Sequence, residues 1–333
     1  MKRIIAFVLT VMMTVGLLAG CGDGGKEQRV VNVCSWGEYI DESLIGEFEA
    51  QTGIHVNYQT AESNETLYSL LQTGGADFDV IVPSDYMIGR LIDEGMLAEL
   101  DYSAIPNYDL IDPQYKSLSF DPENKYTVPY SWGTVGIIYN TKMVDEPITS
   151  WKQLWDEGIA SQLALPDITV TSGPYMIEVA GKVAGVDPAE NEDPAFELIE
   201  QLADNGATFY ESSGDLASKF ELGEVSVAVC QDFDASTITS AVDGLEYVIV
   251  PEEGSYLGIN QVNITKSCKN TDLAYKFISW LISYDVQYQD AIDRVEAPAN
   301  MKVELTEEQA ASAPETFVTK DAIGPKFKGL KYR

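Results

Sequence analysis

The chain has 333 residues, enough for about two domains, and its 53 acidic against 21 basic residues give a formal net charge of −32. A surface this negative repels phosphate backbones, which excludes nucleic acid as a partner, and it attracts small cations. Solubility alone is an equally good reason for the charge. The four cysteines contain no close pair, so the sequence predicts no disulfide framework, no metal site and no cofactor.

The amino-terminal segment has the pattern of an export signal. A positive start precedes an apolar run to Leu18, and small residues follow before Cys21. The segment Leu17-Leu18-Ala19-Gly20-Cys21 resembles the bacterial motif at which a cysteine is lipidated. We therefore expect a signal peptide over residues 1–20 and a lipidated tether over residues 21–28, which hold the protein on the outer face or periplasmic side of the cell membrane. An ordinary signal peptide with an incidental cysteine is the alternative.

Up to residue 133 the chain alternates between strand and helix patterns. The predicted strands are 30–34, 54–58 and 78–82, and the predicted helices are 43–52, one around Leu67, Leu70 and Leu71, and 87–94. Strands separated by single helices favour a parallel sheet with helices on its faces. These elements are expected to form a first α/β lobe.

A second set of the same kind follows residue 133. The predicted strands are 134–139, 162–165, 207–210, 225–230 and 261–265, and the predicted helices are 150–157, 175–184, 195–205, 214–222 and 273–282. The runs around Thr134 and Gln261 are placed to cross between two lobes, and such crossings form a hinge. We predict one lobe from residues 29–133 and 260–300 and another from residues 134–259 and 301–333, with a ligand cleft that closes between them.

Aromatic and acidic side chains follow the ends of several predicted strands, where open parallel sheets bind their ligands. The candidate residues are Trp36, Glu38, Tyr39, Ser63, Ser84, Asp85, Tyr86, Asp167, Gln231 and Asp234, with Trp132 just before the first crossing. An aromatic face attracts a cation, and a carboxylate forms a charge-assisted hydrogen bond with an ammonium group. The combination is typical of an amine site.

Each of these residues also has a structural interpretation. A serine or aspartate after a strand often caps the next helix, which is the alternative for Ser63, Ser84 and Asp232, the last of which follows Gln231 at the same strand end. Burial in the core is the alternative for Trp36 and Trp132. The agreement among several strand ends therefore carries more weight than any single residue.

Catalysis is poorly supported by the residues. The only histidine, His55, lies in an alternating strand pattern away from the strand ends, which argues against a catalytic triad and a histidine-rich metal site. The chain has neither a phosphate-binding loop nor a dinucleotide-binding glycine turn. We predict a binding protein rather than an enzyme, and a hydrolase that uses paired carboxylates is the alternative.

Several blocks of sequence resemble one known family. The blocks are Ser35-Trp36-Gly37-Glu38-Tyr39, Glu62-Ser63-Asn64-Glu65-Thr66, Phe78-Asp79-Val80-Ile81-Val82-Pro83-Ser84, residues 121–133 and Thr149-Ser150-Trp151. In their order and spacing they are similar to the bacterial spermidine/putrescine-binding proteins that serve ABC importers, over about residues 30–300. The resemblance implies an α/β fold of the periplasmic-binding-protein type, a polyamine ligand held by aromatics and carboxylates, and permease subunits of an importer as partners.

The resemblance also implies roles for single positions. Trp36, Tyr39, Glu38, Ser84 and Tyr86 match first-lobe ligand contacts of the family, and Asp234 matches an aspartate of its putrescine-binding members. Other positions depart from the pattern: Thr171 stands for an acid, Gln231 for a tryptophan, Gly258 for an aromatic residue, Asn260 for an aspartate and Glu296 for a tyrosine.

Taken together, the sequence predicts a monomeric, lipid-anchored binding protein that captures a polyamine or another small organic amine for an importer. Because the second lobe departs from the family pattern, the same scaffold retuned for a zwitterionic or neutral solute is the first alternative. A role in presenting the ligand to a membrane sensor would use the same cleft.

Overall fold

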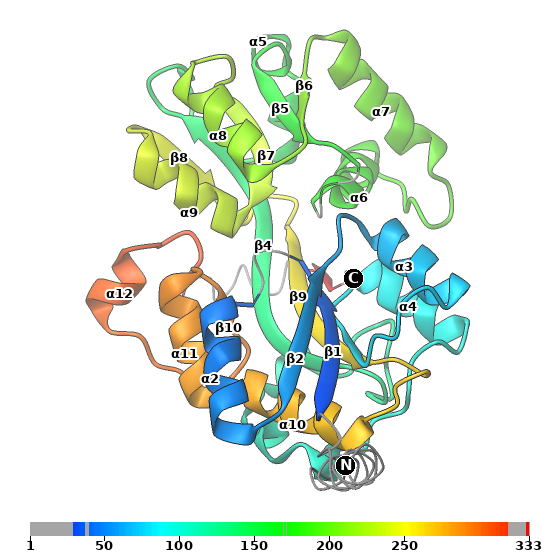
Figure 1. The fold of residues 1–333 in the computed structure, drawn as a ribbon. Helices are drawn as coiled ribbons and strands as arrows, with labels where there is room; N and C mark the ends of the chain where they lie inside the picture. Colours follow the sequence, from blue (N-terminus) through cyan, green and yellow to red (C-terminus); the bar gives the residue numbers. More distant parts are fainter. Residues whose placement is uncertain (1–28, 37–39, 169, 171, 319–330, 333) are drawn as a thin grey trace, which may run out of the picture.

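A computed structural model of the chain describes residues 29–36, 40–168, 170, 172–318 and 331–332. Figure 1 shows two lobes, one above the other, joined by strands β4 (Val128–Asn140) and β9 (Tyr256–Ile264), which run through both. The two strands pair antiparallel from Val128 and Val262 to Val135 and Tyr256. The predicted α/β fold with two lobes and a hinge is therefore confirmed.

Lobe 1 is built on a sheet with the strand order β2-β1-β3-β9. Strands β1 (Val30–Ser35), β2 (His55–Thr60) and β3 (Val80–Ile81) are parallel, and β9 is antiparallel to β3. One face of the sheet packs on α2 (Glu42–Thr52), α10 (Thr271–Leu281) and α11 (Tyr284–Asp293), and the other on α3 (Asn64–Thr73) and α4 (Asp85–Asp93). Helices on both faces bury the apolar side chains of parallel strands.

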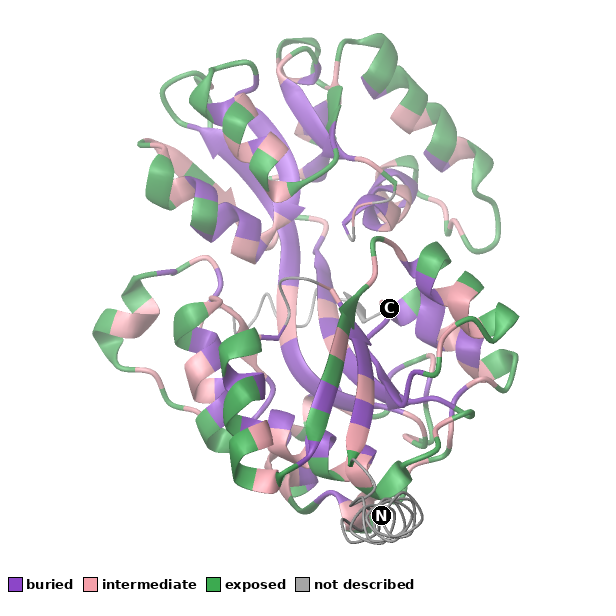
Figure 2. Ribbon diagram, in the orientation of Figure 1, coloured by how far each residue is buried: buried purple, intermediate pink, exposed green. Residues whose placement is uncertain are grey.

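Lobe 2 repeats this arrangement with the strand order β4-β7-β5-β6 and β8 (Leu245–Val248) beside β4. Strands β5 (Leu163–Pro166), β6 (Thr208–Tyr210) and β7 (Val227–Gln231) are parallel, and β4 is antiparallel to β7. Helices α6 (Gly173–Ala184) and α7 (Asp193–Asp204) cover one face, and α8 (Ser213–Glu221) and α9 (Asp232–Ala241) the other. Figure 2 shows β4 buried along most of its length in both lobes.

Short elements complete the chain. They are the 3₁₀ helices η1 (Tyr102–Ala104), η2 (Pro106–Leu110), η3 (Pro113–Tyr115) and η4 (Trp151–Trp155), the helices α5 (Glu157–Ala160) and α12 (Glu307–Ala311), and the strands β10 (Ala297–Pro298) and β11 (Lys331–Tyr332). β10 pairs with β4, and β11 pairs with β9. No described helix is both long and apolar enough to cross a membrane.

The segment after β10, which the sequence analysis assigns to lobe 2, begins on lobe 1. The Met301 amide donates to the Leu110 carbonyl (2.9 Å). The Gln309 amide group donates to the Tyr288 hydroxyl of α11 (2.9 Å). Lobe 2 contacts the segment further on, where the hydroxyls of Ser236 and Thr316 are 3.0 Å apart. The segment therefore contacts both lobes.

Most predicted elements are found near their expected positions, with three kinds of difference. The predicted helix 150–157 is wrong, because an extended residue, Asp156 (ψ 133°), separates the 3₁₀ helix η4 from α5. Strand β9 begins at Tyr256 rather than at residue 261, since Gly258 and Asn260 are weak strand formers that hide its first half. Elements β8, α9 and α11 were not predicted, because their polar faces blur the apolar pattern.

Candidate functional site

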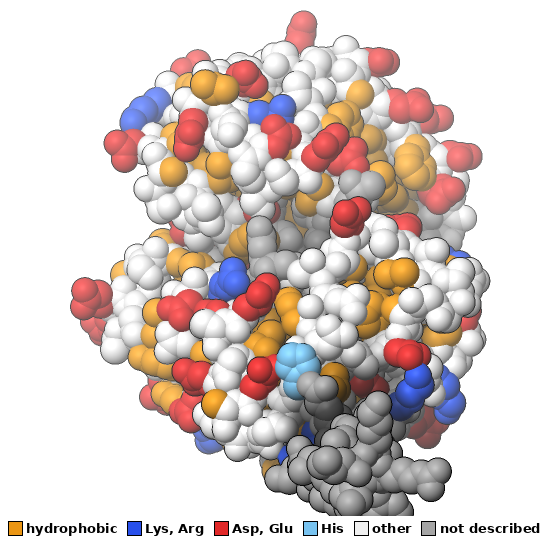
Figure 3. All heavy atoms as spheres, in the orientation of Figure 1, with side chains coloured by type: hydrophobic (Ala, Val, Ile, Leu, Met, Phe, Trp, Pro, Cys, Tyr) orange, Lys and Arg blue, Asp and Glu red, His pale blue; other side chains and the backbone are white. Residues whose placement is uncertain are grey.

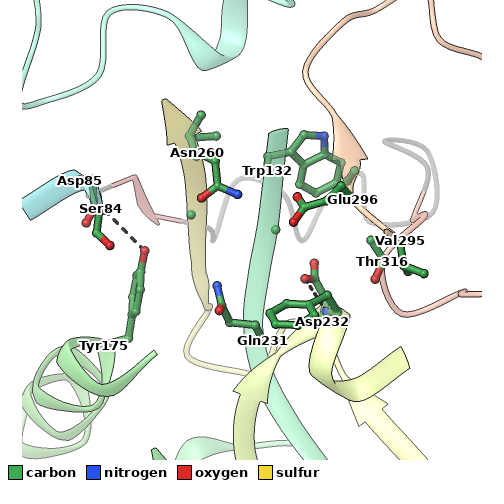
Figure 4. Close-up of a pocket in the computed structure, with 15 residues that line it drawn as sticks. Ser84, Asp85, Trp132, Tyr175, Gln231, Asp232, Asn260, Val295, Glu296 and Thr316 are labelled. Carbon is green, nitrogen blue, oxygen red and sulfur yellow. Dashed lines mark hydrogen bonds between the residues drawn. The ribbon is translucent and has the colours of Figure 1, made fainter. Parts of the chain in front are cut away.

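A narrow pocket, partly open to solvent, lies between the lobes where β4 and β9 cross. Figure 3 shows the waist between the lobes as a hollow. The pocket is lined by Ser84, Asp85, Trp132, Gly133, Tyr175, Gln231, Asp232, Phe233, Gly258, Ile259, Asn260, Val295, Glu296, Ala297 and Thr316. Both lobes and both hinge strands thus contribute to one site (Figure 4).

Asp232 forms one end of the pocket from the first turn of α9. Its carboxylate accepts hydrogen bonds from the amide (2.7 Å) and hydroxyl (3.1 Å) of Thr134 and from the Phe233 amide (2.9 Å). Gly133 is required beside it, because a Cβ there would lie 2.8 Å from the carboxylate. Burial raises the pKa of Asp232 to about 7 despite these donors.

Glu296 lies at the same end, and Figure 4 shows its carboxylate between Trp132 and Asp232. It precedes β10, which pairs with Ser131 and Trp132 of β4. Burial, with the negative charges of Asp290 and Asp232, raises the pKa of Glu296 to about 8, although the Ser131 hydroxyl opposes the shift. A cation placed beside a carboxyl with this pKa would strongly stabilise its ionised form.

The backbone before Glu296 is strained. Val295 has φ of +58°, a left-handed conformation that costs a β-branched residue about 1–3 kcal/mol. Strain of this size persists where the surrounding structure requires it, and here it accompanies a side chain that faces the pocket.

Asp85 lies at the opposite end, in the first turn of α4. One carboxylate oxygen accepts from the Tyr86 amide (2.7 Å) and the other from the Tyr175 hydroxyl of lobe 2 (3.5 Å). The neighbouring Ser84 does not cap the helix through its side chain. Asn64 holds it instead, with its amide group donating to the Ser84 hydroxyl (3.0 Å) and its oxygen accepting from the Ser84 amide (3.0 Å).

Amide and aromatic side chains lie between the two acidic ends. Asn260 on β9 donates to the Ser131 hydroxyl (2.8 Å), and Gln231 ends β7. Trp132 stacks on Tyr115 with the ring centres 5.8 Å apart, and its indole N–H donates to the Pro298 carbonyl (3.2 Å). The arrangement can bind a ligand with positive charge at both ends.

Six of the residues proposed from the sequence line this pocket: Ser84, Asp85, Trp132, Gln231, Asn260 and Glu296. Four others, Cys21, Glu38, Tyr39 and Thr171, lie outside the described residues. The remaining candidates, Trp36, Ser63, Tyr86, Asp167 and Asp234, do not line the pocket.

The structure gives the surroundings of these five candidates outside the pocket lining. Trp36 packs against the lobe 1 core, and Ser63 caps α3 by accepting from the Thr66 amide (3.1 Å). Tyr86 is 39% exposed. The Asp167 amide donates to a carbonyl of β6 (2.9 Å), and Asp234 is buried in α9.

Tyr175 was not predicted from the sequence, and Asp232, at the end of a predicted strand, was left open between a ligand contact and a helix cap. The signal for Asp232 was present, since it directly follows a buried strand, but its side chain bonds to Thr134 of the hinge strand rather than capping α9 through the N-cap position. Tyr175 had no comparable signal, because it reaches the pocket from the second residue beyond the start of α6.

The two lobes, the hinge of two crossing strands and the interlobe pocket define the class of two-lobed solute-binding proteins. The family profile of the bacterial extracellular solute-binding proteins matches residues 43–318. The chain belongs to this family.

Similarity to individual proteins is also high. The chain is 32% identical to the spermidine/putrescine-binding periplasmic protein of Escherichia coli over 84% of its own length and 79% of that protein. A spermidine/putrescine ABC transporter protein from Listeria monocytogenes has a solved structure with 34% identity and a TM-score of 0.77, covering 91% of this chain and 92% of that one. The substrate-binding protein PotD from Streptococcus pneumoniae, solved with calcium and HEPES, has 30% identity and a TM-score of 0.75 at the same coverage.

Proposed function

We propose that the protein binds a polyamine, or a similar small diamine, between its lobes and delivers it to an ABC importer. The observation that carries the proposal is the placement of carboxylates at both ends of the interlobe pocket, with Glu296 and Asp232 at one end and Asp85 at the other. The names of relatives that are at least 30% identical support the same ligand class.

The electrostatics of the pocket favour a cationic ligand. A buried charge is costly unless it is paired, and Glu296 and Asp232 both have a pKa raised by burial in the ligand-free protein. An ammonium group between them would stabilise their charged forms, and the face of Trp132 would add a cation–π contact. Glu38, Tyr39, Trp36 and Asp234 remain proposed contributors on the basis of the family resemblance.

A zwitterionic ligand is less favoured by the pocket. Its carboxylate would need a positive partner, and the described residues that line the pocket include no Lys, Arg or His. We also propose that the protein is not an enzyme. The single histidine, His55, lies on the edge strand β2 and is paired with Glu49 (2.7 Å).

Calorimetry with putrescine, spermidine and agmatine tests the ligand class. We expect saturable binding of at least one amine, and no binding of 4-aminobutanoate, which has the chain length of putrescine but one carboxylate end. Mass spectrometry of ligand that co-purifies with the protein is an independent measurement. The proposal fails if none of the three amines produces heat and no amine co-purifies.

We further propose that Cys21 carries a lipid that keeps the binding protein beside its importer on the outer face of the membrane. The Leu17-to-Cys21 motif supports this, and stable anchoring would need more than one acyl chain. Metabolic labelling with a fatty acid should mark the wild-type protein and not the Cys21→Ser variant. Equal labelling of both proteins would contradict the proposal.

A further inference from the structure

Tyr175 belongs to lobe 2 but contacts a carboxylate of lobe 1. Its hydroxyl donates to Asp85 at 3.5 Å, and the two residues are 5% and 7% exposed. Figure 4 shows this contact at the end of the pocket opposite Glu296. Because the two groups come from different lobes, their contact exists only when the lobes are together, which is the state that encloses a ligand.

The Tyr175 hydroxyl occupies space beside β9 that a side chain at position 258 would need. A Cβ built on Gly258 would lie 3.2 Å from the hydroxyl oxygen, which is tighter than an ordinary contact. The aromatic face at this end of the pocket comes from α6 rather than from β9.

Neighbouring contacts hold Tyr175 in place. Its ring packs on that of Tyr256 with the centres 5.6 Å apart, and the Lys182 ammonium lies 4.7 Å from the centre of the Tyr256 ring. Helix α6 begins at Gly173, where a Cβ would be only 2.1 Å from the Asp167 carbonyl oxygen. The start of the helix therefore fits closely against the preceding loop, which fixes the direction of Tyr175.

We infer that Tyr175 sets the selectivity of the site for diamines over monoamines, by orienting the Asp85 carboxylate toward the second ammonium of the ligand. The inference rests on the proposed function, that the ligand is an amine. One ammonium lies with Glu296 and Asp232, and Asp85 receives the other. With the Tyr86 amide on one oxygen and the Tyr175 hydroxyl on the other, the carboxylate is held in one orientation.

The test compares putrescine with 1-aminobutane, which has the same carbon chain and one ammonium. In calorimetry, Tyr175→Phe should weaken putrescine binding by about tenfold and weaken 1-aminobutane binding much less, so the ratio of putrescine to 1-aminobutane affinity falls. A merely structural role would weaken both ligands equally, and an unchanged ratio overturns the inference. Tyr139→Phe is the matched control, since it removes a tyrosine–carboxylate bond to Glu246 (2.8 Å) in lobe 2, outside the pocket lining.

A second variant acts on the same hydroxyl from the other side. Gly258→Ala alone should displace the Tyr175 hydroxyl and lower the ratio of putrescine to 1-aminobutane affinity. When it is added to Tyr175→Phe, it should lower that ratio no further. Additive effects would overturn the inference. If wild-type protein binds none of putrescine, spermidine and agmatine and no amine co-purifies, the proposed function falls and this inference with it, whereas amine binding with unchanged selectivity in Tyr175→Phe overturns this inference alone.

Discussion

Replacing Glu296 by glutamine is expected to weaken putrescine binding by about 100-fold at a pH of about 8.5, where the carboxyl is largely ionised. Removing one partner of a buried, hydrogen-bonded charge pair costs about 2–5 kcal/mol, and 1.4 kcal/mol is tenfold in affinity. Glutamine has nearly the same shape as glutamate, so the pocket keeps its volume while the ammonium loses its countercharge. Calorimetry of the two proteins with putrescine measures the change.

The same substitution should have the opposite effect on the ligand-free protein. The pKa of Glu296 is raised from 4.5 to about 8, so its ionisation destabilises the folded state progressively from about pH 4.5 and fully above about pH 8. Glu296→Gln should therefore raise the free energy of unfolding by about 1 kcal/mol or more at neutral pH. The exposed Glu304 provides the control, because Glu304→Gln should change neither quantity. Unchanged putrescine affinity in Glu296→Gln would place the ammonium elsewhere.

Local patterns in the sequence were sufficient to predict the fold. The strands that alternate with single helices in lobe 1 follow directly from the apolar spacing, and they were found close to the expected residues. The crossing around Thr134 was also visible, because a β-rich run there is followed by a complete second set of elements. The crossing at β9 was placed only in part, since Gly258 and Asn260 interrupt the strand pattern where the strand lines the pocket.

The candidate site was less accessible from the sequence than the fold. Ser84 and Gln231 were found because they lie at the carboxyl ends of β3 and β7, where the topology brings strand ends together. Trp36 and Ser63 follow strand ends as well, yet one packs on the core and the other caps a helix. Sequence position alone does not distinguish these outcomes, because the direction of a side chain depends on contacts with distant elements.

Tyr175 and Asp232 illustrate this dependence. The role of Asp232 comes from Thr134, which is 98 residues away in the chain, and that of Tyr175 comes from Asp85, which is 90 residues away. The Tyr175–Asp85 contact requires the two lobes to come together, whereas the Thr134–Asp232 contact follows from the pairing of β4 with β7 inside lobe 2. The residues that the sequence could not assign are thus those whose environment is made by elements distant in the chain.

Putrescine affinity is expected to rise with pH, by roughly 10- to 100-fold between about pH 6 and pH 8. In the free protein Glu296 has a pKa of about 8 and Asp232 a pKa of about 7, both raised chiefly by burial, so below these values the pocket holds protons that an ammonium must displace. Asp290, whose pKa burial also raises to about 7, adds negative charge near Glu296, while Arg294 opposes it. Above about pH 8 the affinity should level off until the ligand amines lose their own protons near pH 10.

Calorimetry in buffers of different ionisation enthalpy measures the protons released on binding. Wild-type protein should release roughly one proton or more per putrescine near pH 7, because the bound ammonium lowers the pKa of the carboxyls around it. Glu296→Gln should release fewer protons and show a shallower rise of affinity with pH, since one of the two carboxyls with a raised pKa at that end of the pocket has then been removed. An affinity that stays constant from about pH 6 to pH 8, with no proton release, would mean that the ammonium does not pair with these buried carboxyls, even if an amine is the ligand.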